Sequence, residues 1–430
     1  MTIILAIVSI PALASAQTEP APNDAALGQP PARTPPATTP PAAGGTDPPG
    51  AASPGATTPA PGAKEPEKRW YDVINLGAFV DTYYSQNWNA PKPNTGTNLY
   101  QPYTAHAGFG LAWVGLDASV DPDPVGAVMQ LRFGPAVPNL TLGDSAIPGG
   151  IGFVQNGYVS WRPSGKDGKL TLIAGKFDTV YGAEVAQSQL NFNYTRSALY
   201  NAQPFFHTGL RADIQMSVQF ALKLLAVNGW NNTIDNNSGK SLGAQLSVTP
   251  AEGYVFSLGY MGGPEESDYV AAPPPAPGGV SPGIVRNVGN DSRMRHLVDI
   301  IGDMKLTPDF RAVVNGTYVT QTVVDPANKS DKSVSWFGAE LLARYAFSEM
   351  WAAAVRGEYI KDKDGLVTAP NTKGLSLLTG TLTLEAAPHK NLVIRLDNRL
   401  DLADAEVFST LHATSKTQFT TTLGIVAKTN

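Results

Sequence analysis

The sequence lacks cysteine, long apolar runs and an excess of basic residues, and each absence excludes a class of protein. Without cysteine, the chain cannot form disulfides or thiolate metal sites. The formal net charge of −5 argues against a nucleic-acid-binding protein, which normally has a basic face. No apolar stretch reaches the roughly 20 residues that a membrane-spanning helix needs. We therefore predict no nucleic-acid partner and no helical membrane span.

The residues that are plentiful favour an all-β protein. Glycine occurs 42 times, aromatic residues make up 9% of the chain, and charged residues only 16%. Such a composition suits many strands joined by turns better than a helical protein.

The first 69 residues differ from the rest. Residues 1–16 contain an apolar run followed by Ala14-Ser15-Ala16, the small-x-small pattern that precedes a signal-peptidase cut, so we predict a mature start at Gln17. No Lys or Arg precedes that run. Residues 17–69 are rich in Pro, Ala and Thr and hold almost no large apolar side chain, which predicts a disordered periplasmic tether. Extended polyproline conformation would also let this segment reach into peptidoglycan.

From Trp70 to the C-terminus, apolar and polar residues alternate with the two-residue period of a strand that has one apolar face. The pattern predicts sixteen strands, at 72–87, 105–119, 124–134, 152–162, 168–177, 207–216, 219–229, 240–250, 252–262, 292–306, 309–323, 331–347, 349–362, 371–387, 390–403 and 415–427.

The connections between these strands alternate between short and long along the whole chain. Thr307-Pro308 and Ser348-Glu349 are tight turns, whereas Asn231–Gly239 and Gly263–Asp291 are longer loops. This alternation is typical of a transmembrane antiparallel up-and-down β-barrel, with short periplasmic turns and longer extracellular loops. At about 16 strands, such a barrel encloses an aqueous channel.

The longest polar excursion, Asp178 to Phe206, lies between two alternating strands and predicts a loop that narrows the channel. The motifs around it, GKFDT, YGAEV, NYTRS and FHTGLR, resemble the putative β-barrel porin-2 (OmpL-like) family of Gram-negative outer membranes, from about Trp70 onward. The resemblance implies an outer-membrane porin for passive diffusion. The chain departs from outer-membrane barrels in lacking an aromatic residue at its end.

Charged residues on the polar faces of the strands and in this loop are the candidate lumen residues. We predict that opposed acidic and basic groups set a transverse field that selects permeants, or that the loop charges simply pair with the wall. A mild cation preference follows only if the lumen shares the acidic excess of the chain. The candidates are Asp178, Glu184, Arg196, Arg211, Asp213, Arg132, Glu340, Arg344, Arg356, Glu358, Arg395, Asp397, Arg399 and Asp401.

Two other classes of protein remain open from the sequence. One is a secreted or surface β-sheet binding protein or adhesin, in which the charged faces meet solvent. The other is an outer-membrane barrel enzyme, for which His207 could meet Ser188 or Asp178 only by folding. The five histidines have no metal-ligand spacing, so we predict neither a cofactor nor a metal. The expected partners are outer-membrane lipid, small hydrophilic solutes or ions, and a second copy of the chain in a homo-oligomer.

Overall fold

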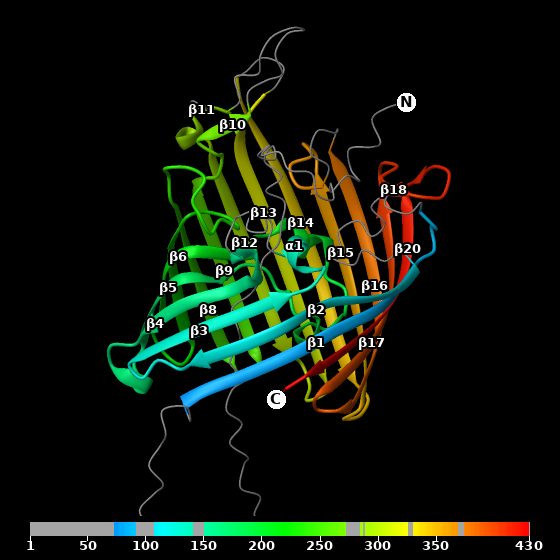
Figure 1. Cartoon of the computed structure of the whole chain (residues 1–430), viewed down its shortest axis with the longest axis horizontal. Coiled ribbons are helices and arrows are strands. Elements are labelled where there is room, and N and C mark those ends of the chain that lie inside the picture. The colour runs from blue at the N-terminus through cyan, green and yellow to red at the C-terminus, as the bar shows by residue number, and fades with distance from the viewer. Residues whose placement is uncertain are drawn as a thin grey trace, which may run out of the picture.

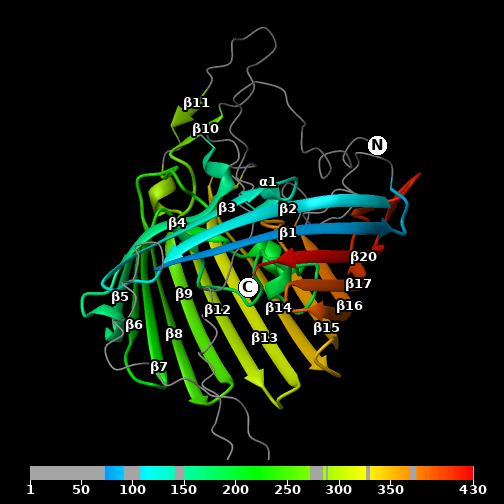
Figure 2. The ribbon, with the colours of Figure 1, turned by 60° about the horizontal axis from the view of Figure 1, so that its bottom comes forward.

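Sixteen antiparallel strands form a closed barrel in the computed structural model, which describes residues 73–91, 107–140, 150–271, 284–286, 289–325, 330–368 and 374–429 (Figure 1). Each strand pairs with the next one along the chain, and β20 closes the barrel by pairing with β1, which lies beside it in Figure 2. Closure leaves no free edge in the barrel, so every strand of its wall has two hydrogen-bonded neighbours.

The strands of the wall match the sixteen predicted ones, with ends that differ by a few residues. Because lipid-facing and inward-facing residues alternate, the two-residue period locates these strands well. They are β1 (Ile74–Asn87), β2 (Ala107–Val120), β3 (Val125–Phe133), β4 (Val154–Trp161), β5 (Leu170–Asp178), β6 (Phe206–Gln215), β7 (Phe220–Val227), β8 (Ser241–Ala251), β9 (Tyr254–Pro264), β12 (Met294–Lys305), β13 (Phe310–Val324), β14 (Asp331–Ala346), β15 (Trp351–Asp362), β16 (Leu375–His389), β17 (Leu392–Ala403) and β20 (Thr417–Lys428).

The connections carry short elements that the strand period did not predict. Two are small hairpins, β10 (Tyr269–Ala271) with β11 (Ile284–Arg286) and β18 (Phe408–Ser409) with β19 (Thr414–Ser415). In the part of the chain that the structure describes, the helices are α1 (Val137–Leu140), α2 (Ala198–Ala202) and four 3₁₀ turns at Ile151–Phe153, Gly165–Asp167, Ser188–Leu190 and Asn290–Ser292. Among the described residues, no helix is long and apolar enough to cross a membrane. The predicted signal peptide and Pro-rich segment lie outside the described residues.

The outer face of the wall is apolar. Leu400 on β17, Leu382 on β16 and Val355 on β15 all point outward and are exposed, whereas their strand neighbours on the other face are buried. Exposed apolar side chains continue along the remaining strands. A patch of this extent does not suit a protein surrounded by water, but it suits lipid. The soluble β-sheet interpretation is therefore not supported.

The inside of the barrel is filled in part by the connection between β5 and β6. Its residues, 179–205, are largely buried, although they belong to no wall strand. Longer connections contribute Trp230 and Phe408 to the same interior cluster. The lumen is therefore narrowed from within by the chain itself.

Candidate functional site

Residues 179–205, the lumen loop, leave the wall at the end of β5 and return at the start of β6. His207 of β6 joins the two ends through its Nε2, which lies 2.9 Å from Thr179 Oγ1. Its Nδ1 lies 2.9 Å from the carbonyl oxygen of Gly229, in the connection after β7. The carbonyl can only accept, so Nδ1 carries the proton and Nε2 accepts from the Thr179 hydroxyl. Both ring nitrogens are thus used at the root of the loop.

Carboxylates of the wall accept hydrogen bonds from the loop backbone. The Gly182 N–H donates to Asp299 Oδ2 at 3.0 Å, on β12. The Thr195 N–H donates to Asp397 Oδ2 at 2.8 Å, on β17. The Ala198 N–H, at the start of α2, donates to Glu358 Oε2 at 2.5 Å, on β15. Backbone donors inside a lumen need partners of this kind, because buried unpaired N–H groups are costly. Tyr194 and Leu199 donate to the same carboxylates.

Arginines of the wall bind the loop from the same side. Arg356 Nη1 lies 2.8 Å from Glu184 Oε1 and also donates to the Thr195 carbonyl. Arg399 Nη1 donates to the Arg196 carbonyl at 2.6 Å. Charge-assisted hydrogen bonds are stronger than neutral ones, and here the arginines are fully enclosed. The loop is therefore anchored by alternating acidic and basic groups of β15 and β17.

Glycines in the wall make room for aromatic side chains of the loop. A Cβ at Gly424 of β20 would lie 2.1 Å from the Tyr194 ring, and a Cβ at Gly259 of β9 would lie 2.7 Å from the Tyr181 ring. Tyr194 donates its hydroxyl to Asp81 Oδ1 at 2.6 Å, and Tyr181 donates to the Tyr260 carbonyl at 2.8 Å. Burial raises the pKa of the Tyr181 hydroxyl above its usual range, and nearby Asp299 adds to this. The loop thus touches walls on both sides of the lumen.

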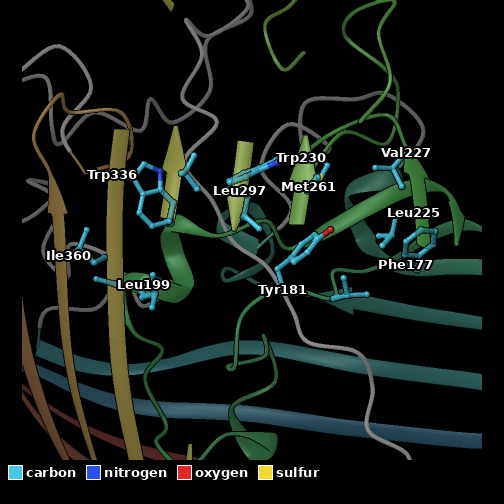
Figure 3. Close-up of a cluster of buried hydrophobic side chains, with 14 of the residues drawn as sticks. Phe177, Tyr181, Leu199, Leu225, Val227, Trp230, Met261, Leu297, Trp336 and Ile360 are labelled. Carbon is cyan, nitrogen blue, oxygen red and sulfur yellow. The ribbon is translucent and has the colours of Figure 1, made fainter. Parts of the chain in front are cut away.

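An apolar cluster holds α2 against the wall. Figure 3 shows Leu199 beside Ile360 and Trp336, which face inward from β15 and β14. On the other side of the cluster, Tyr181 lies toward Phe177 and Leu225. All these side chains are almost completely buried. Burial of such side chains adds roughly 1.5–3 kcal/mol each to the stability of the packed loop.

Four of the other predicted residues, Arg132, Asp178, Arg211 and Asp213, lie on the strands beside the root of the loop. Arg132 on β3 forms an ion pair with Asp117 at 2.6 Å and lies over the Phe79 ring at 5.0 Å. Arg211 on β6 contacts both oxygens of Asp213, each at 2.9 Å. Asp178 accepts from Gln155 at 3.4 Å. Near the loop root, Arg132 and Arg211 are thus paired with carboxylates of the wall, and Asp178 accepts a hydrogen bond from a neutral side chain.

Two carboxylates oppose each other under α2. Glu340 on β14 and Glu358 on β15 are directly paired across the strands and both are buried. Arg356 Nε lies 3.6 Å from Glu358 Oε1. Like charges directly opposite each other destabilise a strand pair, so Arg356 of β15 and Arg399 of β17, which both lie near Glu358, offset this repulsion. Arg399 also pairs with Asp401 at 2.7 Å, and Arg344 with Glu385, which pairs with Arg395 as well.

The structure thus gathers Glu184, Arg196, Arg356, Glu358, Asp397 and Arg399 around the loop, and places Arg132, Asp178, Arg211 and Asp213 beside its root. Sequence reasoning missed Asp81 and Asp299, which also hold the loop. The sequence shows that both lie on the polar face of a strand. Many other residues do so too, so this position alone does not identify residues that bind the loop. Whether these charges select permeants stays a prediction.

The described contacts do not assemble a hydrolytic triad. His207 contacts Thr179 and Gly229, whereas Ser188 donates to Asp81 Oδ2 at 2.6 Å. Within the described ranges, no group of three or more acidic or histidine side chains could hold a metal ion.

A closed sixteen-stranded barrel with an apolar outer belt and a long loop folded into its lumen defines an outer-membrane porin. Residues 73–428 match the model of the putative beta-barrel porin-2, OmpL-like family, and the chain belongs to that family. The family and the fold place the protein in the outer membrane, in contact with lipid.

Solved structures with a similar fold are outer-membrane channels and porins. The outer membrane channel DcaP of Acinetobacter baumannii has a TM-score of 0.54 at 12% identity, covering 83% of this chain and 97% of its own. The anion-selective porin from Comamonas acidovorans has a TM-score of 0.50 at 12% identity, covering 83% and 99%. OprB of Pseudomonas putida has a TM-score of 0.50 at 11% identity, covering 83% and 94%. At these identities the likeness concerns the fold alone. No curated protein sequence matches the chain.

Proposed function

We propose that this porin passes small hydrophilic solutes or ions by passive diffusion, and that the lumen loop sets the narrowest part of the path. The observation that carries this proposal is the fixed position of the loop: it is bound to β9, β12, β15, β17 and β20 rather than lying outside the barrel. A loop that is held on several sides narrows the lumen permanently. Solutes then pass it by diffusion, which needs no energy source or cofactor.

Ion current across a planar lipid bilayer tests the channel. Purified, detergent-refolded protein should give stepwise, reproducible increases in conductance, and the same preparation boiled before addition should give none. A protein that inserts into the bilayer but never conducts would contradict the proposal.

We also propose that the charged residues around the loop act first as its anchors. Supporting this, Glu184 contacts Arg356, and the Arg196 carbonyl is bound by Arg399. These charged residues then affect ion selectivity indirectly, by setting the position of the loop, rather than directly, by attracting or repelling the ion. Reversal potentials of anchor variants, compared with their conductance, separate the two effects.

Three proposals concern the ends of the chain and its assembly. Processing before Gln17 would be seen as an N-terminal peptide in mass spectrometry of the exported protein. Contact of residues 17–69 with peptidoglycan would be seen as sedimentation with purified sacculi, abolished by deletion of this segment. A homo-oligomer would be seen by crosslinking in native membranes.

A further inference from the structure

A row of basic side chains crosses three neighbouring strands at the end of the barrel that has short turns. Lys305 on β12 is directly paired with Arg311 on β13, and Arg311 is directly paired with Arg344 on β14. All three belong to the inward-facing set of their strands, because they alternate with outward-facing apolar residues such as Tyr345. We call these three residues the basic row.

The basic row is only partly neutralised. Arg311 is bound to Asp303, whose Oδ1 lies 2.7 Å from Arg311 Nε. Arg344 is bound to Glu385, but Glu385 also binds Arg395 Nη2 at 2.7 Å. The row and Arg395, four basic side chains in all, thus share two carboxylates, which leaves an excess of positive charge. Exposed turns nearby carry Glu252, next to Gly253 whose carbonyl accepts from the Lys305 N–H, and Asp309 and Glu349. These three acidic residues lie outside the row itself, so the positive excess is confined to the inward-facing side chains.

The basic row also lies next to the lumen loop. The Arg311 guanidinium carbon is 5.7 Å from the centre of the Phe192 ring, which belongs to the loop. Ile301 and Leu342, inward-facing residues nearer the loop on β12 and β14, lie in an apolar cluster with Phe192 packed against it. A solute that has passed the loop therefore meets this row next.

The basic row remains accessible to water, unlike the anchors of the loop. The Arg311 and Arg344 side chains are 43% and 31% exposed, whereas Arg356 and Arg399 are fully buried. Like charges placed directly opposite each other weaken a strand pair. Arg395 connects the Arg344–Glu385 pair to the loop, because it also donates to the Ser188 and Asn193 carbonyls, whereas the Arg311–Asp303 pair joins β13 to β12. A row of water-accessible cations that costs stability points to an electrostatic role.

We propose that the basic row attracts small anions, such as chloride, phosphate or carboxylates, to the short-turn mouth of the lumen and makes the channel prefer anions to cations. This inference rests on the proposed channel function. Clefts lined by charge of one sign raise the local concentration of oppositely charged solutes. The preference is opposite to the one that the acidic excess of the whole chain would suggest, because selectivity depends on the charges beside the path.

The test compares reversal potentials in a KCl gradient for the wild-type porin and the double variant Arg311→Gln/Arg344→Gln. The control is Lys390→Gln, which removes one positive charge from an exposed turn at the same end of the barrel. Wild type should prefer chloride. The double variant should lose about twofold in anion-over-cation permeability per charge removed, as expected for a charge about 8 Å from the ion in about 0.1 M salt, because the charge attracts anions and repels cations and screening about halves both effects. The difference should shrink in about 1 M salt, where the Debye length is only about 3 Å.

A second readout separates failure of this inference from failure of the channel proposal. In detergent at constant ionic strength, phosphate should raise the temperature at which the wild-type barrel unfolds, but should not do so for the double variant. If no variant conducts and this shift is present, the basic row stands and the channel proposal fails. If the channel conducts with equal reversal potentials in wild type and double variant, or if neither readout shows an anion effect, the basic row has no such role.

Discussion

At the scale of single residues, Arg356 is the most heavily used anchor. It binds Glu184, lies near Glu358, and donates to the carbonyls of Thr195 and Arg196. Replacing Arg356 with Met removes every one of these bonds and leaves two enclosed carboxylates without their nearest counter-charge. Breaking a buried ion pair in this way costs on the order of 3–5 kcal/mol.

We therefore predict that Arg356→Met unfolds at a lower temperature than wild type. In samples heated stepwise before electrophoresis, it should shift from the gel mobility of the folded barrel to that of the unfolded chain at a lower temperature. Its single-channel current should also be noisier, because the loop is held less firmly. The matched control is Lys361→Gln, which removes a charge from the exposed face of the same strand. Equal unfolding temperatures for the two variants would show that Arg356 does not anchor the loop.

A glycine gives a second prediction at this scale. Any side chain at Gly424 would overlap the Tyr194 ring, so Gly424→Val must push Tyr194 away from Asp81. Without the hydrogen bond between Tyr194 and Asp81, the loop should shift from β20 and single-channel conductance should change. Gly380→Val is the control, because no atom lies within 4 Å of a Cβ built there. If both variants conduct like wild type, the close approach of Tyr194 is not needed to position the loop.

At the scale of elements, the lumen loop is bound to the wall strands along its length. Asn193 donates to Thr383 Oγ1 at 2.7 Å, so a loop side chain here meets a wall side chain of β16. The chain has no cysteine of its own, so the pair Asn193→Cys/Thr383→Cys can form only the intended disulfide within one chain. We predict that oxidising this variant leaves conductance unchanged relative to its reduced form, because the loop is already held there. A large change on oxidation would show that the loop moves during conduction.

The strands could be predicted from the sequence, whereas the contacts of the loop could not. The sequence predicts that Leu400 faces lipid and Arg399 faces the lumen, because successive residues of a barrel strand point to opposite sides of the wall. The pairing of Thr195 with Asp397, by contrast, joins positions about two hundred apart, and no local pattern encodes it. Likewise, the basic row depends on register: Lys305, Arg311 and Arg344 become neighbours only once β12, β13 and β14 are aligned.

At the scale of the whole molecule, the two faces of the barrel wall have different roles. The outer belt meets lipid and fixes the protein in the membrane, while the ion pairs that hold the loop lie inside. Because the two sets of residues alternate along each strand, the same substitution should have different effects on the two faces. A charge is expected to be costly where it meets lipid and tolerated where it meets water.

Leu400 tests this division. Its side chain is 42% exposed on the outer face of β17, between Gly380 of β16 and Phe419 of β20. Leu400→Arg places a charge in the apolar belt, and near the bilayer midplane this costs about 2–4 kcal/mol. We predict a clear decrease in the amount of barrel folded into lipid vesicles at a given urea concentration, measured by the difference in gel mobility between boiled and unboiled samples. Leu411→Arg is the matched control, since Leu411 is 47% exposed in the connection between β18 and β19. It should fold like wild type. Equal folding of both variants in vesicles would mean that the outer face of β17 does not contact the hydrocarbon of the membrane.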